Sequence, residues 1–395
     1  MSSKIIGNNL YKIFGEHPAK ALELLKAGKG KDRIYEETGQ TVGVNDVSFQ
    51  VAEGEIFVVM GLSGSGKSTL VRMINGLIKP SAGEILIDGI DVASCSSDEL
   101  RHVRRDKVAM VFQHFALFPH KTVADNVAFG LKIKGINSAE RRERALAALE
   151  QVGLGPRSDS YPDELSGGMQ QRVGLARGLA SEPEILLMDE PFSALDPLIR
   201  SDMQHELLEL QRSLKKTIVF ITHDLKEALT LGSTIAIMRN GAVVQTGTAQ
   251  EIVGKPADDY VSAFTKDIDR SLVFTAQSIA RPVQALDLDG ADIPSAIRFM
   301  DQLGVDAMHV VKDDKFVGLV TYRAVSAALR NGGALIDVVS GDFPTAAPQT
   351  HLYDLYVLAE KGLPIALTEG GEGSGRPTGI VSPGAVFAQL SDGRT

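Results

Sequence analysis

The chain has 395 residues, of which 44% are hydrophobic and 23% charged, a composition typical of a folded protein with two or three domains. Its formal net charge of −9 argues against a protein that acts mainly on nucleic acid, because phosphate binding usually brings an excess of basic residues. The single cysteine, Cys95, excludes an internal disulfide. The N-terminus lacks a signal-peptide pattern and the apolar runs are of strand length, so we expect a soluble protein whose role at any membrane depends on partners.

An inserted segment, residues 16–40, separates an early strand from the strand-like run at residues 44–51. Pro18 suits the first turn of a helix, and Gly28 and Gly30 suit its end. We therefore predict a short helix followed by a loop, which together form a solvated appendage.

A glycine-rich run follows the apolar strand at residues 55–60 and opens a helix. Glycines in such a run let successive backbone N–H groups converge on phosphates, and the helix N-terminus adds partial positive charge there. Lys67 would place a full charge near the β- and γ-phosphates of a nucleotide, and the Ser68 hydroxyl could reach Mg²⁺. We assign the whole run to nucleotide binding: Gly61, Leu62, Ser63, Gly64, Ser65, Gly66, Lys67, Ser68 and Thr69.

Further strands and helices alternate after this loop. Strand-like runs occupy residues 108–112, 184–190, 217–223 and 234–247, and helical patterns occupy residues 139–152, 168–180 and 198–214. This alternation predicts an α/β domain with a mainly parallel sheet.

Two carboxylates, Asp189 and Glu190, end the apolar strand that begins at residue 184. Buried charge is costly unless it is paired or bound to metal, so packing alone does not explain them. We assign Asp189 to Mg²⁺ and Glu190 to activation of the attacking water as a general base.

The C-terminal part, from about residue 267, contains 16 acidic and 10 basic residues, a net charge of −6, and lacks comparable motifs. Residues 315–329 and 376–390 share a Gly, an apolar pair, Thr or Ser, and then Ala-Val. An apolar strand precedes each run. The pattern predicts two repeats of a β-α-β-β-α unit.

The stretch LSGGMQQR, residues 165–172, resembles the signature motif of ABC transporter ATPases. Gln113, the run Ser193–Asp196 and His223 follow the order of that family's other motifs, and the resemblance covers residues 5–264. It implies a P-loop ABC cassette with a mainly parallel sheet, an antiparallel β lobe and a helical subdomain. It also implies a homodimer that holds two ATP molecules between its subunits, head to tail.

The resemblance assigns further roles. Ser166 can cap a helix whose first N–H groups form an anion site, and Gly167 and Gly168 keep that end free of side chains. In the family this site contacts the γ-phosphate of the ATP bound by the other subunit. The residues that the resemblance implies are Gln113, His223 and Glu190 for catalysis, Ser68, Gln113 and Asp189 for Mg²⁺, and Ser166, Gly167, Gly168, Gln170 and Asp196 for ATP.

Two aromatic regions complete the expected site. Phe14 lies where the family keeps an aromatic residue that stacks on adenine, with Tyr11 as the alternative, and either residue could belong to the core instead. The apolar loop at residues 114–119 would contact a coupling helix of a membrane subunit.

A closer resemblance, to the ATPases of glycine betaine/proline importers, rests on the inserted segment, on residues 160–180 and 188–200, and on the C-terminal repeat. It implies import of a compatible solute with two membrane-spanning permease subunits and an extracytoplasmic solute-binding protein, at the cytoplasmic face of the membrane. The domains would be residues 1–266, a CBS-like repeat at 267–334 and a second at 335–395. Thr321 and Ser382 are each followed three residues later by Ala, not by the Asp that holds ribose in nucleotide-binding CBS pairs.

The closer resemblance implies osmotic control through the tail, by ionic strength or a cyclic dinucleotide. The acidic balance would allow docking to an anionic membrane that depends on salt, because salt screens the repulsion. Two other readings stay open. One is a soluble ABC ATPase that acts on nucleic acid or ribosomes, although the single P-loop and the acidic balance disfavour it. The other is a protein that is chiefly a ligand-sensing regulator through its tail.

Overall fold

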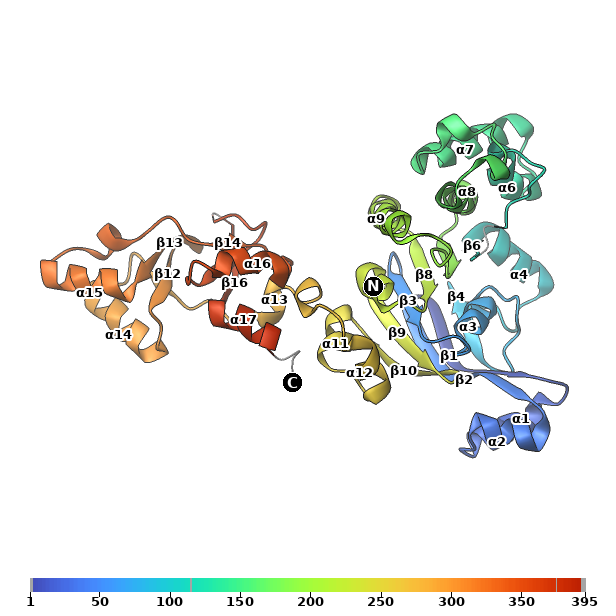
Figure 1. Ribbon diagram of the computed structural model, residues 1–395, viewed down its shortest axis with the longest axis horizontal. Coiled ribbons are helices and arrows are strands. Elements are labelled where there is room, and N and C mark those ends of the chain that lie inside the picture. The colour runs from blue at the N-terminus through green and yellow to red at the C-terminus, as the bar shows by residue number, and fades with distance from the viewer. Residues whose placement is uncertain (1–2, 114–115, 374, 392–395) are drawn as a thin grey trace. The chain divides into compact units, whose positions relative to one another are not determined.

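The computed structural model describes residues 3–113, 116–373 and 375–391. The chain forms two compact units, residues 1–265 and 266–395 (Figure 1). The first unit contains every motif that the sequence assigns to nucleotide chemistry.

The first unit is an α/β unit with two sheets. Its strands are β1 (Ser3–Phe14), β2 (Thr41–Ala52), β3 (Ile56–Met60), β4 (Ala82–Ile87), β5 (Ile90–Asp91), β6 (Val108–Val111), β7 (Ile185–Asp189), β8 (Thr217–Thr222), β9 (Thr234–Arg239) and β10 (Ala242–Gly247). Its α-helices are α1 (Pro18–Lys26), α2 (Lys31–Thr38), α3 (Lys67–Ile74), α4 (Ser97–His102), α5 (Val123–Val127), α6 (Phe129–Ile133), α7 (Ser138–Gln151), α8 (Gly167–Ala180), α9 (Pro197–Leu214), α10 (Leu225–Leu231), α11 (Ala249–Gly254) and α12 (Asp259–Thr265). A π-helical turn, Val103–Lys107, and 3₁₀ turns at Gly155–Arg157 and Pro162–Glu164 complete it.

The larger sheet has the strand order β10-β9-β3-β8-β7-β6, and all its pairs are parallel except β10 with β9. This agrees with the mainly parallel sheet predicted from the sequence. All five residues of β3 and of β7 are buried, as expected for strands covered on both faces. Because β3, β7 and β8 are parallel, the loops that follow them leave the same edge of the sheet.

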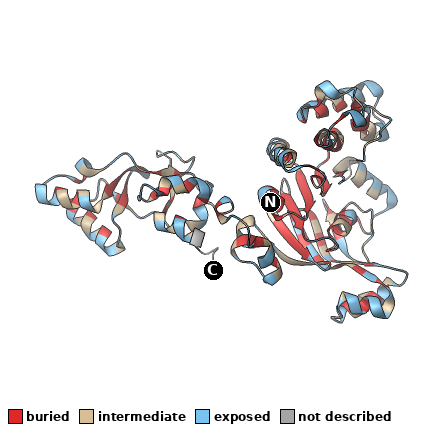
Figure 2. Ribbon diagram, in the orientation of Figure 1, coloured by how far each residue is buried: buried red, intermediate tan, exposed pale blue. Residues whose placement is uncertain are grey.

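The smaller sheet is antiparallel, with the order β2-β1-β4-β5. One hydrophobic core joins it to the larger sheet and to α3, so that Val44 and Phe49 of the small sheet share a cluster with Leu70 of α3 and Ile221 of β8. Figure 2 shows the strands of the large sheet as the most continuously buried part of the unit. This core holds the glycine-rich loop between two rigid layers.

The segment that contains the signature motif is helical. Helices α6, α7 and α8 lie together at one end of the unit, apart from α3 (Figure 1). Helix α8 begins at its glycine pair because the Ser166 hydroxyl accepts a hydrogen bond from the Met169 amide and so caps the first turn.

The inserted segment differs from its prediction. It contains two helices, α1 and α2, where we predicted one helix and a loop. It is also more than a solvated appendage, because Ala21, Leu25 and Ile34 pack against Ile13 and Val42 at the ends of β1 and β2. Ile34 is the one buried residue of α2, so the sequence of that helix offers little hydrophobic periodicity to detect.

The second unit contains two halves with the same order of elements. The first has β11 (Ala285–Asp287), α14 (Ile293–Leu303), β12 (Ala307–Lys312), β13 (Lys315–Thr321) and α15 (Tyr322–Asn331); the second has β14 (Thr345–Ala346), α16 (Leu352–Ala359), β15 (Ile365–Thr368), β16 (Pro377–Val381) and α17 (Pro383–Ser391). A short helix α13 (Ala276–Ile279) and 3₁₀ turns at Arg270–Leu272 and Leu335–Val338 complete the unit. In each half one parallel and one antiparallel pair form a three-stranded sheet, which matches the predicted β-α-β-β-α repeat.

Within the described ranges, none of the helices combines the length and the apolar character needed to cross a bilayer.

Candidate functional site

The run Gly61–Thr69 connects the end of β3 to the first turn of α3, as predicted. Its backbone passes so close to neighbouring strands that only glycine fits at two positions. A Cβ on Gly61 would lie 2.4 Å from the Met238 carbonyl oxygen, and a Cβ on Gly66 would lie 2.4 Å from that of Gly43. Both glycines also have φ values, 156° and 103°, that other residues rarely adopt. The loop is therefore held in one conformation by its surroundings.

Lys67 is buried at the base of this loop. Its Nζ donates hydrogen bonds to the carbonyl oxygens of Gly61 (2.8 Å) and Leu62 (3.1 Å) and lies 3.8 Å from Glu190 Oε1. Burial lowers the pKa of the Lys67 ammonium, whereas the charges of Glu190 and Asp189 act to raise it. A buried ammonium that faces two carbonyls and a carboxylate is well suited to a more strongly charged partner such as a phosphate.

Ser68 and Asp189 come together across the boundary between α3 and β7. The Ser68 hydroxyl donates a hydrogen bond of 2.9 Å to Asp189 Oδ1. Asp189 Oδ2 lies 3.9 Å from the Arg72 guanidinium one turn further along α3. Hydroxyl and carboxylate oxygens are the ligand types that Mg²⁺ takes beside phosphates, so this pair fits that ion.

Glu190 follows β7 and points toward His223, which follows the neighbouring strand β8. The imidazole Nδ1 of His223 lies 2.9 Å from Glu190 Oε2. The Glu190 backbone has a φ of 46°, and its amide donates to the Ile221 carbonyl. A non-glycine residue in this left-handed region is destabilised by about 1–3 kcal/mol, and such residues cluster at functional sites.

A further observation indicates that the loop suits a phosphate ligand. The Ser65 hydroxyl is buried and has no hydrogen-bond partner among the described residues. It lies in the same loop as the Lys67 ammonium and directly before the N-terminus of α3, so hydrogen-bond donors and positive charge gather at one point. The residues present therefore fit a magnesium–nucleotide complex.

Gln113 is exposed and follows β6, the strand that pairs with β7 at the same sheet edge. Of the predicted apolar loop at 114–119, His114 and Phe115 lie outside the described residues. Within the remainder of the loop, Phe118 packs on the helical segment, because its ring centroid lies 4.6 Å from that of Phe129 at the start of α6.

Of the two candidate aromatic residues, Phe14 is the more accessible. The residue is 39% exposed, and the Lys12 ammonium lies 5.2 Å from the centroid of its ring. Tyr11 is half-buried, because it packs against the cluster formed by the inserted helices. The Lys26 ammonium lies 5.7 Å from the centroid of its ring. The geometry therefore favours Phe14 as the stacking residue.

The predicted ATP ligands of the signature motif do not lie at the P-loop of the same chain. Ser166, Gly167 and Gly168 form the N-terminal end of α8, in the helical segment. Gln170 turns back toward the preceding turn, where its amide nitrogen donates to the carbonyl oxygens of Pro162 (2.9 Å) and Leu165 (3.2 Å).

Asp196 acts as the N-cap of α9, where its Oδ1 accepts a hydrogen bond of 3.1 Å from the Ile199 amide. Its carboxylate therefore has a structural partner within its own chain, besides the ATP-binding role that the resemblance implies.

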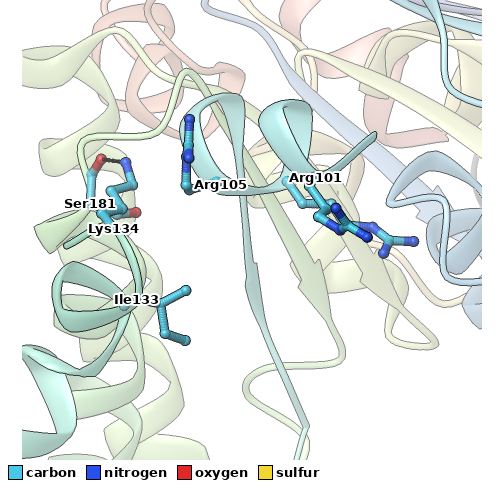
Figure 3. Close-up of a pocket in the computed structure, with 7 residues that line it drawn as sticks. Arg101, Arg105, Ile133, Lys134 and Ser181 are labelled. Carbon is cyan, nitrogen blue, oxygen red and sulfur yellow. Dashed lines mark hydrogen bonds between the residues drawn. The ribbon is translucent and has the colours of Figure 1, made fainter. Parts of the chain in front are cut away.

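A hollow of about 470 Å³ lies between the helical segment and the sheet-bearing part of the first unit. Figure 3 shows Ile133 projecting from α6 into it, across from Arg105, and Lys134 donating to the Ser181 carbonyl. Ile133 is 67% exposed. The lining residues are Arg101, Arg104, Arg105, Gly130, Ile133, Lys134 and Ser181.

The sequence analysis missed one buried charged group near the site. Glu227 lies on α10, four residues after His223, and it is only 5% exposed. The Glu227 carboxylate contacts Thr222, Gln204 and Arg200. The sequence could have indicated this residue, because Glu227 shares a helix face with the apolar Leu231 and lies next to Ala228. A charge on the buried face of a helix needs a partner.

Comparison with known proteins places these observations in context. The family model described as ABC transporter matches residues 44–193. The chain is 53% identical over 363 residues to the glycine betaine/proline betaine transport system ATP-binding protein ProV of Salmonella typhimurium, covering 89% of this chain and 91% of that one. It is 49% identical to the glycine betaine/carnitine transport ATP-binding protein GbuA of Listeria monocytogenes, covering 98% of both chains. A dimeric ATP-binding cassette solved in a post-hydrolysis state with ADP and phosphate superposes with a TM-score of 0.53 at 34% identity, covering 62% of this chain and 98% of that one.

Proposed function

The chain belongs to the ABC transporter family as an ATP-binding subunit, and from this premise we propose that it energises import of glycine betaine, proline betaine or a related quaternary amine. The transport relatives support the substrate class. The observation that carries the ATPase assignment is the convergence of Lys67, Ser68, Asp189, Glu190 and His223 at one edge of the sheet. These side chains come from the start of α3, the end of β7 and the loop after β8, and each has the type and position that phosphoryl transfer needs.

The proposed reaction is in-line attack of water on the γ-phosphate, which yields ADP and phosphate. Lys67 would bind the β- and γ-phosphates, and Ser68 and Asp189, with Gln113, would hold Mg²⁺, which neutralises phosphate charge when bound. Glu190 Oε1 or Oε2 would accept the proton of the attacking water. His223, 2.9 Å from Glu190, would orient that carboxylate and reach toward the γ-phosphate.

A second copy of the chain would complete each site. Helix α8 has 14 residues and begins with two glycines behind the Ser166 cap. The amides of Gly167 and Gly168 therefore have no side chains of their own beside them. We infer that Ser166, Gly167 and Gly168 bind the γ-phosphate held by the partner's P-loop, with Phe14 stacked on adenine. The similarity to a dimeric cassette supports this arrangement.

The membrane partners would be two permease subunits and an extracytoplasmic solute-binding protein, with this chain at the cytoplasmic face of the membrane. The hollow beside α6 supports a permease contact because it combines an exposed apolar side chain, Ile133, with a rim of basic residues. Helix α6 also carries Phe129, which contacts the loop that the sequence analysis assigned to a coupling helix.

A reconstituted complex tests the proposed function. We expect labelled glycine betaine to enter vesicles only when the chain, its permease subunits, the solute-binding protein and ATP are all present. In the same assay Ile133→Asp should abolish transport while the isolated chain keeps its ATPase activity, because the change places a charge on an exposed contact. Tyr35→Asp, at an exposed aromatic residue 59% accessible on α2, is the matched control and should transport normally. Transport by Ile133→Asp at the rate of the unaltered chain would contradict the contact, and transport of no quaternary amine would contradict the substrate class.

The second unit would be a regulatory, CBS-like pair of repeats at about residues 267–334 and 335–395. The Thr321 and Ser382 hydroxyls each accept a hydrogen bond of 3.3 Å from the amide three residues later, so both are used as helix caps. This arrangement supports a signal other than simple ribose binding, and the net charge of −6 supports a response to ionic strength.

Removal of the tail tests that role. A chain that ends at residue 265 keeps both sheets and the core of the first unit, so we expect its ATPase activity to persist. In the reconstituted complex, its transport rate should no longer rise or fall with salt between about 0.05 and 0.5 M, a range over which the Debye length shrinks severalfold. A salt profile identical to that of the full chain would contradict the assignment.

A further inference from the structure

We propose that Arg200 and Glu227 are positioning residues that hold His223 against Glu190 and connect this pair to the loop at residues 193–196. The inference rests on the proposed ATPase and deepens it, because it assigns two residues of that site. Neither residue would touch the nucleotide. Their effect would be transmitted through the Thr222 hydroxyl, which donates to Glu227 beside His223, and through the Leu195 carbonyl, which accepts from Arg200.

Glu227 is the central residue of this network. Its carboxylate is buried, with Oε2 accepting a hydrogen bond of 2.5 Å from the Thr222 hydroxyl and Oε1 accepting one of 3.2 Å from the Gln204 amide. Burial raises the pKa of this carboxyl group, whereas the hydrogen bond from Thr222 lowers it. Thr222 is the last residue of β8 and directly precedes His223.

Arg200 approaches the same place from α9. Its Nη2 donates a hydrogen bond of 3.0 Å to the Leu195 carbonyl, in the loop at 193–196. Its Nη1 lies 3.6 Å from Asp224 Oδ2, and its Nε lies 3.7 Å from Glu227 Oε1. One planar guanidinium therefore connects the loop before α9 to both ends of the first turn of α10.

These contacts close a circuit around the two catalytic side chains. The Thr222 hydroxyl accepts a hydrogen bond of 2.9 Å from the Asp224 amide, so the residues on both sides of His223 are fixed. His223 contacts Glu190 at 2.9 Å, and the Ser193 hydroxyl donates a hydrogen bond of 3.0 Å to the Glu190 carbonyl. Ser193 lies two residues before Leu195, whose carbonyl oxygen accepts the hydrogen bond from Arg200.

A gain in stability alone does not explain why the chain contains the charged pair Arg200 and Glu227. Replacing a buried ion pair with well-packed apolar side chains of similar volume is often neutral or stabilising. The geometry here is restricted by the hydrogen bonds of Glu227 with Thr222 and Gln204 and by that of Arg200 with Leu195, while the two charges lie 3.7 Å apart. The network reaches both segments that set the distance between His223 and Glu190, which is the geometry that catalysis requires.

Glu227→Gln tests the proposal in the full-length chain. The amide keeps the shape of the side chain but loses the charge that faces Arg200. We expect kcat for ATP to fall about tenfold, within the range of coupling between neighbouring residues, while the KM for ATP stays within about twofold. Arg200→Lys keeps the charge but cannot reach Leu195 and Asp224 together, so it should act in the same direction. Glu209→Gln, an exposed carboxylate on α9, is the matched control and should leave both constants unchanged.

Two readouts separate positioning from general destabilisation. In a His223→Ala background, Glu227→Gln should have almost no further effect on the remaining turnover, because its route of action is gone. In ¹⁵N spectra of histidine-labelled protein, the His223 signal of Glu227→Gln should move toward the position that it has in Glu190→Gln. This measurement does not depend on turnover. An equal loss of turnover with and without His223, or a His223 signal that stays at the wild-type position, would overturn the proposal. If wild type hydrolyses ATP and Glu227→Gln matches it, this inference fails and the ATPase assignment stands.

Discussion

Lys67→Ala is expected to lower the affinity for ATP roughly 100-fold, because charge-assisted hydrogen bonds to the phosphates are lost from a buried position. Lys67 is only 4% exposed, and its ammonium is the one group of the P-loop that brings a full positive charge to the site. The substitution also removes the Lys67 donor from the carbonyl oxygens of Gly61 and Leu62, although Leu62 still accepts from the Ser65 amide. Equilibrium binding of a fluorescent ATP analogue measures the change.

Two variants control for effects on folding. Lys67→Met keeps most of the apolar stem of the side chain and should show the same loss of affinity with a smaller change in melting temperature. Lys312→Ala removes an exposed lysine of the second unit that pairs with Asp289, and its ATP affinity should equal that of wild type. Unaltered ATP binding by folded Lys67→Ala would remove the P-loop from the mechanism.

Glu190→Gln is expected to reduce turnover about 10³-fold, the range found when a general base is removed. The amide group that replaces the carboxylate cannot accept the proton of the attacking water, although it fills the same space beside His223. ATP affinity should be at least that of wild type, because a negative charge close to the phosphate site has gone. Single-turnover hydrolysis of γ-labelled ATP measures the rate, with Glu209→Gln as the control at an exposed glutamate. Near-normal hydrolysis by Glu190→Gln would contradict the assignment of the base.

The sequence predicted the parts of the site that depend on contiguous residues. The run Gly61–Thr69 needs a strand before it, a helix after it and glycines within it, and all three are local features. Asp189 and Glu190 were recognisable because a fully apolar strand ends in two acids. The strands of the large sheet were predictable because each is a short, continuous apolar run with polar or turn residues at its ends.

The sequence could not predict the features that arise from contacts between distant segments. Glu190 and His223 are 33 positions apart, and the 2.9 Å contact between them follows from the parallel pairing of β7 and β8. The circuit through Arg200 and Glu227 depends in addition on how α9 and α10 pack. Helix α2 was missed because its stability comes from one buried residue, Ile34, and from ion pairs such as Lys29 with Glu37. Tertiary contacts decide such elements, and local propensity does not.

The proposed dimer would depend on the N-terminus of α8, and Gly167 offers a selective way to disturb it. A Cβ at Gly167 would meet nothing closer than Leu195 at 3.9 Å, so a side chain fits there in the monomer. An Asp at this position would favour the helix through its dipole but repel a phosphate. Gly167→Asn supplies the same shape without the charge.

The mass of Glu190→Gln in solution with Mg-ATP, measured by size-exclusion chromatography with light scattering, tests the shared-nucleotide dimer most directly. Because hydrolysis is blocked, we predict a species of twice the mass of the single chain, which reverts to the monomer when ADP replaces ATP. Adding Gly167→Asp to the same variant should keep it monomeric, whereas Gly167→Asn should still allow the dimer. A Glu190→Gln chain that binds Mg-ATP and remains monomeric at saturating nucleotide would contradict the account.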